Sequence, residues 1–236
     1  MKPIIALRDW ILVKIKHSWN KNVLVTPRVS NYVDKLVLDK ESPSVKKFYE
    51  QSLQLPMSHM QTEVSQARFL MLLVKAVHAK RILEIGTFRG FSAIHLAEGL
   101  SNDGQIVTCE LSPEYAQEAR NIFSETGMGN KIRIEEGPAI DTLSKLVKDN
   151  EKFDMIFIDA DKENYKDYFI KSRKLISPGG IILIDNVLWG SLVTFKDSSD
   201  PVAKIMRSFN EFVFAEMGKN AVIIPAWDGM MVVIPN

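Results

Sequence analysis

The chain has 236 residues, with 30 Lys and Arg against 29 Asp and Glu, 46% hydrophobic residues and a single cysteine. This length fits one domain, or one domain with an appendage, and is sufficient to bury a substantial core. A net charge of +1 gives no broad basic field for nucleic acid, so a small-molecule partner is favoured over a polyanion. Cys109 alone can form neither an intrachain disulfide nor a zinc-binding cysteine cluster, and we expect a cytoplasmic protein.

Residues 1–58 predict a helical N-terminal appendage, because Pro27, Pro43 and Pro56 divide a segment without strand-like alternation. Charged residues interrupt the apolar stretch at 4–15, so we expect neither a membrane span nor a secretory signal. The spacing of its apolar residues fits a short amphipathic helix that packs on the body of the protein or on a partner subunit. A membrane-surface anchor is the alternative for the same helix.

Residues 59–236 predict the main domain, which begins with a largely buried helix over 63–79. Short apolar runs then alternate with helix-length amphipathic segments. Strands are expected at 81–85, 105–109, 131–135, 153–158 and 180–184. This alternation predicts an α/β fold with a doubly wound, mostly parallel sheet and right-handed crossovers.

Local signals mark several ends of these elements. Ser112 and Pro113 predict a helix start, with serine as the N-cap and proline at the first helical position. The Pro178-Gly179-Gly180 sequence should stop the helix that begins near Asn164. The apolar runs at 220–225 and 230–234 are separated only by a turn, which leaves no room for a crossover helix. We therefore expect an antiparallel strand at the C-terminus.

The first strand runs into a glycine-bearing turn and then a helix, an arrangement that lets the backbone and a helix N-terminus approach a ligand. Gly86 and Gly90 are present, but Thr87 replaces a glycine that the dinucleotide fingerprint G-x-G-x-x-G requires, which argues against NAD. The turn alone fits a plain strand-to-helix connection equally well.

Two acidic residues favour a ligand at this turn. Glu110 ends the second strand, where a carboxylate can accept hydrogen bonds from both ribose hydroxyls of an adenosine, although a solvated charge is the alternative. Glu84 lies within an apolar strand and needs a partner, either a cationic ligand or a neighbouring lysine. S-adenosylmethionine meets these conditions, since it carries an adenosine and cationic groups but no pyrophosphate.

The fourth and fifth predicted strands both end in acidic residues. Asp159 follows one, and Asp185 and Asn186 follow the other. The carboxyl ends of neighbouring parallel strands meet at one edge, so these oxygens could bind Mg²⁺, Mn²⁺ or Ca²⁺. Helix capping is the alternative for each junction. Lys162 could act there as a general base, or could belong to a solvated lysine-rich face.

Six motifs carry a family resemblance. They are LEIGTFRGFS (83–92), Glu110, EGPA (136–139), FDMIFIDADKENY (153–165), LIDNVLWG (183–190) and WDGMMVV (227–233). Together they resemble the cation-dependent O-methyltransferases related to caffeoyl-CoA and catechol O-methyltransferases, from about Met60 to the C-terminus. The resemblance implies a Rossmann-like class I methyltransferase fold and methyl transfer from S-adenosylmethionine to a hydroxyl of a catechol-like aromatic acceptor.

The resemblance also implies roles for individual residues. The cofactor pocket would be lined by Thr62, Glu84, Gly86, Thr87, Ser92, Glu110, Ala139 and Asp159. Asp159, Asp185 and Asn186 would bind the divalent cation, with Mg²⁺ expected first, and Lys162 would be the base. Trp189 and Tyr165 would lie near the acceptor. The family is typically dimeric, with N-terminal helices that help to close the site.

Two other functions remain open. One is a metal-independent methyltransferase acting on nitrogen in a macromolecule, but such enzymes tend to carry (D/N)PP(Y/F) where this chain has Asp-Ala-Asp-Lys at 159–162. The other is a non-catalytic binding protein, which the intact acidic residues and Lys162 argue against. Residues 204–212 read KIMRSFNEF, without the tyrosines of plant enzymes that act on CoA thioesters, which argues against caffeoyl-CoA as the acceptor.

Overall fold

The computed structural model describes residues 27–235. In this part, the expected N-terminal appendage contains two helices, α2 (Pro27–Leu38) and α3 (Pro43–Ser52), and no strand. The hydroxyl of Ser42 accepts the backbone N–H of Val45 at 3.3 Å and so caps α3. The amphipathic helix expected over 4–15 lies outside the described residues.

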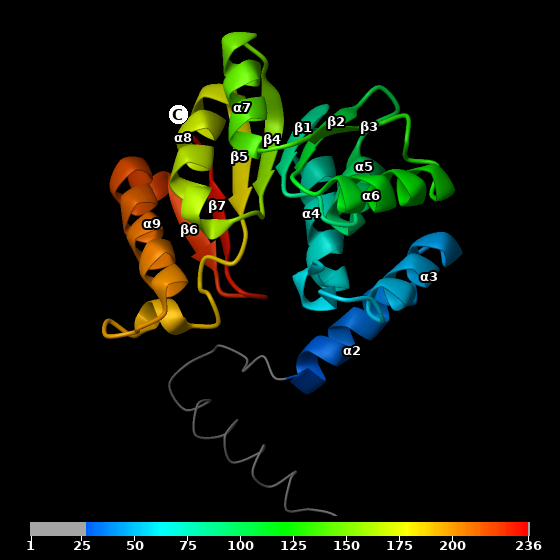
Figure 1. Cartoon of the computed structure of the whole chain (residues 1–236), viewed down its shortest axis with the longest axis horizontal. Coiled ribbons are helices and arrows are strands. Elements are labelled where there is room, and N and C mark those ends of the chain that lie inside the picture. Colours follow the sequence, from blue (N-terminus) through cyan, green and yellow to red (C-terminus); the bar gives the residue numbers. More distant parts are fainter. Residues whose placement is uncertain (1–26, 236) are drawn as a thin grey trace, which may run out of the picture.

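A seven-stranded sheet forms the centre of the molecule, in the order β3-β2-β1-β4-β5-β7-β6 (Figure 1). The strands are β1 (Arg81–Ile85), β2 (Gln105–Glu110), β3 (Ile132–Glu136), β4 (Phe153–Ile158), β5 (Ile176–Ile184), β6 (Ala221–Ile224) and β7 (Met230–Val233). Strands β1 to β5 pair in parallel, whereas β7 lies between β5 and β6 and is antiparallel to both. The predicted parallel sheet and antiparallel C-terminal strand are confirmed.

Helices cover both faces of this sheet. The longer ones are α4 (Val64–Ala76), α5 (Phe91–Gly99), α6 (Pro113–Glu125), α7 (Ala139–Lys148), α8 (Tyr165–Leu175) and α9 (Pro201–Met217). Side chains alternate along each strand, so neighbouring residues enter different cores. Ile82 packs in the cluster that contains α4, α5 and α6, whereas Leu83 packs in the cluster that contains α7, α8 and α9.

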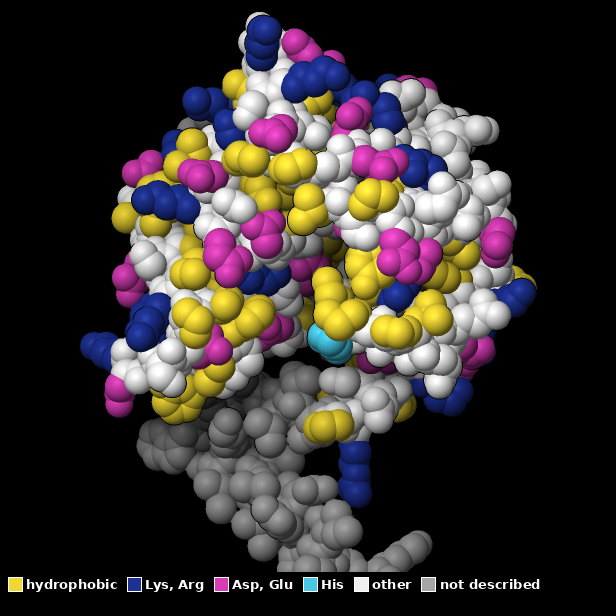
Figure 2. Space-filling model, viewed as in Figure 1, with side chains coloured by type: hydrophobic (Ala, Val, Ile, Leu, Met, Phe, Trp, Pro, Cys, Tyr) yellow, Lys and Arg dark blue, Asp and Glu magenta, His cyan; other side chains and the backbone are white. Residues whose placement is uncertain are grey.

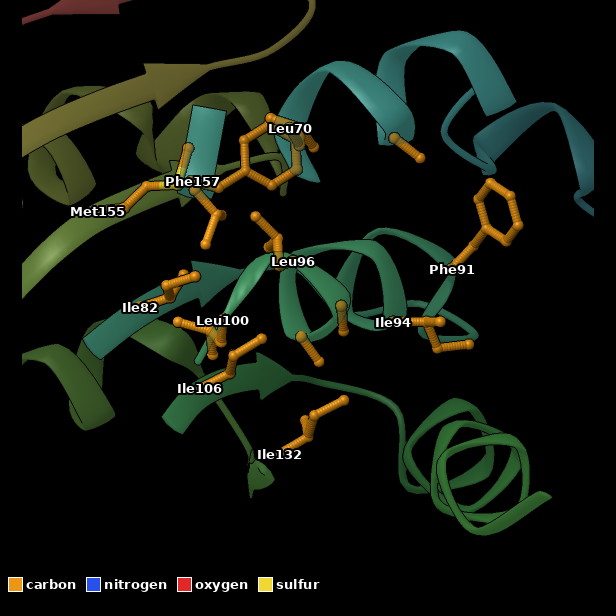
Figure 3. Packing of buried hydrophobic residues seen from close by; sticks show 14 of the residues in the cluster. Leu70, Ile82, Phe91, Ile94, Leu96, Leu100, Ile106, Ile132, Met155 and Phe157 are labelled. Atoms are coloured by element: carbon orange, nitrogen blue, oxygen red, sulfur yellow. The ribbon is translucent and has the colours of Figure 1, made fainter. Parts of the chain in front are cut away.

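Figure 3 shows the first of these clusters, in which Leu70 and Leu96 come from helices and Ile82 and Ile106 from strands. All four side chains are at most 1% exposed. Full burial of such a side chain contributes about 1.5–3 kcal/mol relative to leaving it in water. The apolar runs therefore become the two-sided core that a parallel sheet requires.

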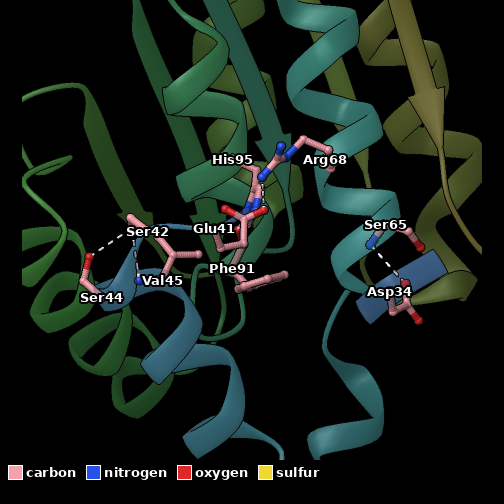
Figure 4. A network of polar contacts seen from close by, with 9 residues as sticks. All are labelled: Asp34, Glu41, Ser42, Ser44, Val45, Ser65, Arg68, Phe91 and His95. Carbon is pink, nitrogen blue, oxygen red and sulfur yellow. Dashed lines mark hydrogen bonds and ion pairs between the residues drawn. The ribbon is translucent and has the colours of Figure 1, made fainter. Parts of the chain in front are cut away.

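The N-terminal helices are attached to the sheet-bearing part through α4 and α5. Val45 of α3 is 1% exposed and belongs to the same core cluster as those helices. At the turn between α2 and α3, the Glu41 carboxylate contacts the guanidinium of Arg68 and lies 3.3 Å from Nε2 of His95 (Figure 4). Burial by itself would raise the pKa of Glu41, but these two contacts hold the pKa below its ordinary value.

The start of β5 differs from the prediction. Helix α8 ends at Leu175 and the strand begins at Ile176, so Pro178-Gly179-Gly180 lies inside the strand and does not stop the helix. The pairing of β4 with β5 shifts register at this point, which accommodates a residue without an N–H. A Cβ on Gly180 would lie 2.8 Å from the Asp154 carbonyl oxygen, so the two backbones approach closely here.

The surface carries mixed charge. Acidic and basic side chains are interspersed over the face in Figure 2, which is hollowed near its centre.

Helix α4 is less buried than expected, since it ends at Ala76 and Leu72 is 54% exposed. None of the helices within residues 27–235 is both long and apolar enough to cross a membrane.

Candidate active site

Gly86, Asp159 and Asp185, three of the predicted site residues, directly follow β1, β4 and β5. These three strands are adjacent and parallel, so the residues that follow them lie along one edge of the sheet. The pairing continues one residue past each strand, because Asp159 N–H donates to Ile85 O and Asp185 N–H donates to Ile158 O, both at 2.9 Å. Asp159 and Asp185 are therefore held in fixed positions by the backbone itself.

Gly86 allows the close approach of β1 and β4 at this edge. Its φ is +100°, and a Cβ at this position would lie 1.8 Å from the carbonyl oxygen of Asp159. We expected this glycine to make room for a ligand. The structure shows that its absent side chain also makes room for the backbone of Asp159.

Glu110 holds the glycine-bearing turn. Its Oε2 accepts the N–H of Phe88 at 2.7 Å, and its Oε1 accepts the N–H of Ser112 at 2.9 Å. The residue is 8% exposed, so the alternative of a solvated charge is wrong. Each carboxylate oxygen retains acceptor capacity for a ligand hydroxyl, and the predicted ribose contact stays a prediction.

Glu84 is a buried acid with an unsatisfied oxygen. It is fully buried, and Oε2 accepts the hydroxyl of Thr108 at 2.6 Å, which in turn lies 2.6 Å from the hydroxyl of Thr87. Oε1 has no hydrogen-bond partner among the described residues. Burial raises the pKa of Glu84 to about 7, against the lowering influence of Ser92 and Thr108.

This environment suits a cationic ligand group. An unpaired buried carboxyl is costly, and no lysine or arginine of the described chain forms an ion pair with Glu84. The alternative of a neighbouring lysine is therefore wrong for residues 27–235. Ser92 is in the first turn of α5, Thr62 precedes α4, and Ala139 begins α7. Their contacts with a cofactor stay predictions.

Lys162 is fixed by three acceptors. Its Nζ donates to Asp159 Oδ1 at 3.2 Å, to Ala160 O at 2.9 Å and to the Tyr165 hydroxyl oxygen at 2.7 Å. The Tyr165 hydroxyl donates to the carbonyl of Asp185 at 3.2 Å, which joins the ends of β4 and β5. The Lys162 side chain is only 11% exposed, so it does not belong to a solvated lysine face.

Tyr165 is a core residue next to Lys162. Its ring is fully buried and packs edge-on against Phe209, with centroids 5.6 Å apart. Burial raises the pKa of the Tyr165 phenol well above its ordinary value, so it stays neutral. The residue therefore supports Lys162, and its predicted proximity to an acceptor stays untested.

Asp185 is 3% exposed and has two close hydrogen-bond donors. Oδ1 accepts the N–H of Asn186 and Oδ2 accepts Nε2 of Gln66, both at 2.7 Å. Burial raises the pKa of Asp185 above its ordinary value, and the nearby carboxylate of Asp159 raises it further. The buried carboxylate of Asp185 and the half-buried carboxylate of Asp159 supply oxygen ligands, the chemistry that Mg²⁺ prefers, and Asn186 follows Asp185 directly.

The segment after β5 has an unusual backbone. Asn186 and Trp189 have φ values of 56° and 47°, in the left-handed region that favours glycine. Asp228, from the turn before β7, accepts the N–H of Gly190 at 2.6 Å and so holds this segment. Burial raises the pKa of Asp228, and the charges of Lys162 and Asp159 are near enough to lower and to raise this pKa, respectively. Sequence reasoning used this turn as a hairpin signal and as part of the WDGMMVV motif, but assigned no role to Asp228.

A second cluster of potential metal ligands lies elsewhere. Glu41, His95 and Glu98 have ligand atoms within 4.8 Å of one another, a grouping found among residues 27–235. His95 Nδ1 donates to the carbonyl of Phe91 at 2.9 Å, and Arg68 already contacts Glu41. A guanidinium inside the cluster supplies the positive charge, so this arrangement is a buried ion-pair network.

The sheet order, the buried Glu84 and the acidic edge define the class: a Rossmann-like class I methyltransferase that uses S-adenosylmethionine. A sequence profile of the O-methyltransferase family matches residues 35–235. The chain therefore belongs to the O-methyltransferase family and is an S-adenosylmethionine-dependent O-methyltransferase.

Individual relatives agree with this assignment. Caffeoyl-CoA O-methyltransferase 2 of Zea mays is 35% identical over 208 residues, which cover 86% of this chain and 78% of the relative. A catechol O-methyltransferase of Niastella koreensis is 37% identical over 176 residues, covering 72% of this chain and 80% of the relative. The crystal structure of an O-methyltransferase from Bacillus cereus in complex with SAH matches with a TM-score of 0.76 at 33% identity, covering 86% of this chain and 97% of that one.

Proposed function

We propose that the enzyme transfers a methyl group from S-adenosylmethionine to one hydroxyl of an ortho-dihydroxy aromatic molecule, and that the reaction depends on a divalent cation. The observation that carries the proposal is the contact of Lys162 with Asp159 and, through Tyr165, with the backbone of Asp185. A base and two carboxylates thus share one edge of the sheet.

The cation would be held by Asp159, Asp185 and Asn186, with Mg²⁺ as the first candidate and Mn²⁺ or Ca²⁺ as alternatives. When bound, a divalent cation lowers the pKa of a coordinated hydroxyl, and two adjacent hydroxyls can chelate it. The acidic pair supports this role because two carboxylates lie together and no lysine or arginine within 27–235 lies within 4.0 Å of Asp185.

Lys162 would take the proton of the reacting hydroxyl at Nζ. Its contacts with Asp159, Ala160 and Tyr165 fix the position of the nitrogen. The ammonium that makes all three contacts would first give up one proton, so that the lone pair of the neutral amine can take the proton of the hydroxyl. The low exposure of the side chain keeps water away from the proton-transfer step. S-adenosylmethionine, when bound, would supply the methyl group to the oxygen nucleophile that this proton removal leaves.

The cofactor would be oriented by the turn after β1. The unsatisfied oxygen of Glu84 supports contact with a cationic group of the cofactor, and Glu110 would accept ribose hydroxyls with the acceptor capacity left beside its two backbone contacts. Thr62, Thr87, Ser92 and Ala139 would complete the pocket around this turn. The hydroxyl of Thr87 already contacts the hydroxyl of Thr108, so the backbone of Thr87 would be the part that contacts the cofactor.

The acceptor would lie beside Trp189, at the mouth formed by the segment after β5. The catechol and caffeoyl-CoA relatives support a small aromatic acceptor, and the tyrosine-free sequence at 204–212, now seen on α9, favours a free catechol over a CoA thioester. We further propose a cytoplasmic homodimer in which residues 1–58 form a helical cover over the site, separate from the methyltransferase domain at 59–236.

The test is a panel of catechols and caffeate assayed with Mg²⁺ and with EDTA. We expect methylation with Mg²⁺, loss of turnover with EDTA, and recovery when Mg²⁺ is restored. Asp185→Ala should abolish the cation dependence and most activity, whereas cofactor binding measured by calorimetry should change little. Asp167→Ala, at an exposed position of α8, is the matched control. Turnover that is insensitive to chelation would refute the cation role.

A further inference from the structure

Gln66 connects helix α4 to the acidic edge of the sheet. Its side chain is buried at 3% exposure, and its Nε2 donates to Asp185 Oδ2 at 2.7 Å. The two residues are 119 positions apart in the sequence, and Gln66 belongs to no motif that carries the family resemblance. A buried amide that donates to a buried carboxylate at the site is a specific contact, because both groups were removed from water to form it.

This contact fixes the orientation of the Asp185 carboxylate. The N–H of Asn186 holds Oδ1, and Gln66 holds Oδ2, so each oxygen has one donor. Two donors on different oxygens set the rotation of the carboxylate plane, and the remaining lone pairs then point in fixed directions. Without Gln66, the Asn186 N–H alone of these two donors would hold the carboxylate, and the carboxylate could rotate.

The donor is also electrically neutral. A lysine or arginine at this distance would cancel the charge of Asp185, whereas an amide satisfies one lone pair and leaves the negative charge available. No lysine or arginine of the described chain lies within 4.0 Å of this carboxylate. The pairing therefore orients the acid without competing with a cation for it.

We infer that Gln66 is a positioning residue for cation binding, which it serves by holding Asp185 in its ligating orientation. The inference rests on the proposed cation dependence and deepens it. Partners that orient metal ligands in this way typically change metal affinity 10–100-fold when removed. Helix α4 follows the N-terminal helices directly, so it would link that cover to the acidic edge.

The test is direct measurement of Mn²⁺ binding to the full-length protein by calorimetry, with Gln66→Met as the variant. Methionine keeps the length of the side chain but cannot donate. We expect Mn²⁺ binding to weaken about 10–100-fold, the KM for the cation to rise in parallel, and kcat at saturating cation to stay near wild type. Binding of S-adenosylmethionine should stay within about twofold, because Glu84 and Glu110, the acidic residues proposed to contact the cofactor, lie on β1 and β2 and share no hydrogen bond with Gln66.

Two further variants sharpen the test. Gln117→Met makes the same substitution at an exposed position of α6 and should leave Mn²⁺ binding unchanged. Gln66→Asn keeps an amide but shortens its reach by one methylene, so it should weaken Mn²⁺ binding in the same way. If Gln66→Met does not fold, as judged by circular dichroism, the Asn variant decides the question.

The outcomes are distinguishable. If wild-type protein binds Mn²⁺ and the folded Gln66 variants bind it equally well, the positioning role is refuted and the cation dependence stands. Equal losses of Mn²⁺ and cofactor binding would indicate general damage to α4 and would also overturn the inference. If wild-type protein binds no Mn²⁺ at all, the proposed cation dependence falls and the inference falls with it.

Discussion

Replacing the buried Glu84 with glutamine should change the stability of the cofactor-free protein in a pH-dependent way. Glutamine has nearly the same shape, and its oxygen can still accept the hydroxyl of Thr108, which lies 2.6 Å from the present carboxyl. The variant cannot ionise. Any difference in stability that grows with pH must then come from the ionisation of residue 84.

The magnitude follows from the pKa. Burial raises the pKa of Glu84 from 4.5 to about 7. Below pH 4.5 both folded and unfolded chains are protonated at this residue. As the pH rises from 4.5 through 7, the unfolded chain releases the proton while the folded chain keeps it, so folding is progressively disfavoured. Since each pKa unit corresponds to about 1.4 kcal/mol, the wild-type protein loses about 3 kcal/mol by pH 8.

The assay is urea denaturation followed by circular dichroism at pH 5 and pH 8, without cofactor. Glu84→Gln should be more stable than wild type at pH 8 by up to about 3 kcal/mol, and the difference should shrink strongly at pH 5. Glu125→Gln, at an exposed position of α6, is the control and should show no such trend. A difference of the same size at both pH values would refute the reasoning.

The same variant should bind S-adenosylmethionine more weakly. If Glu84 contacts a cationic group, loss of its charge removes a hydrogen bond to a charged partner, worth about 1.5–3 kcal/mol. Calorimetry at pH 8 should then show roughly 10–100-fold weaker binding. Unchanged affinity would remove Glu84 from the cofactor pocket.

Substitutions at three further positions test the fold that supports the site. Gly86→Ala should lower the free energy of unfolding by about 3 kcal/mol or more. The new Cβ would lie 1.8 Å from the Asp159 carbonyl oxygen, and the φ of residue 86 is positive, which strains any side chain. A loss under about 1 kcal/mol in urea denaturation would contradict this. Glu41→Gln should cost about 3 kcal/mol in the same assay, since Arg68 loses its buried anionic partner, and an unaffected midpoint would argue against the network. Ser112→Ala should cost about 1 kcal/mol in thermal denaturation by removing the α6 cap, whereas Ser112→Asp should retain it.

The parallel sheet was predictable because each strand is a short run of β-branched or other apolar residues between helix-length segments. The start of β5 was not. Pro178 and its two glycines are a common helix-stop signal, yet the chain accommodates them inside a strand where the pairing shifts register. That outcome depends on the neighbouring strand, which local sequence does not describe.

The acidic residues of the site were predictable from their place at strand ends, since adjacent parallel strands bring such positions together. Gln66 and Asp228 were not, because each reaches the site from a distant element whose approach is decided by packing. The burial of Tyr165 was also unforeseen. Tyrosine in a polar motif fits a ligand contact as well as a core position, and only the packing against Phe209 distinguishes them.

The side chain of Arg89 joins the glycine-bearing turn after β1 to the N-terminal region. It donates to the carbonyl of Pro56 at 3.0 Å and contacts Glu118 at 2.5 Å, while Glu41 contacts His95 from the same N-terminal region. A shortened chain that begins at residue 59 would remove Pro56 and Glu41 together, and would leave a buried guanidinium and imidazole without these partners. An attempt to isolate the methyltransferase domain by cutting there would therefore damage the glycine-bearing turn after β1.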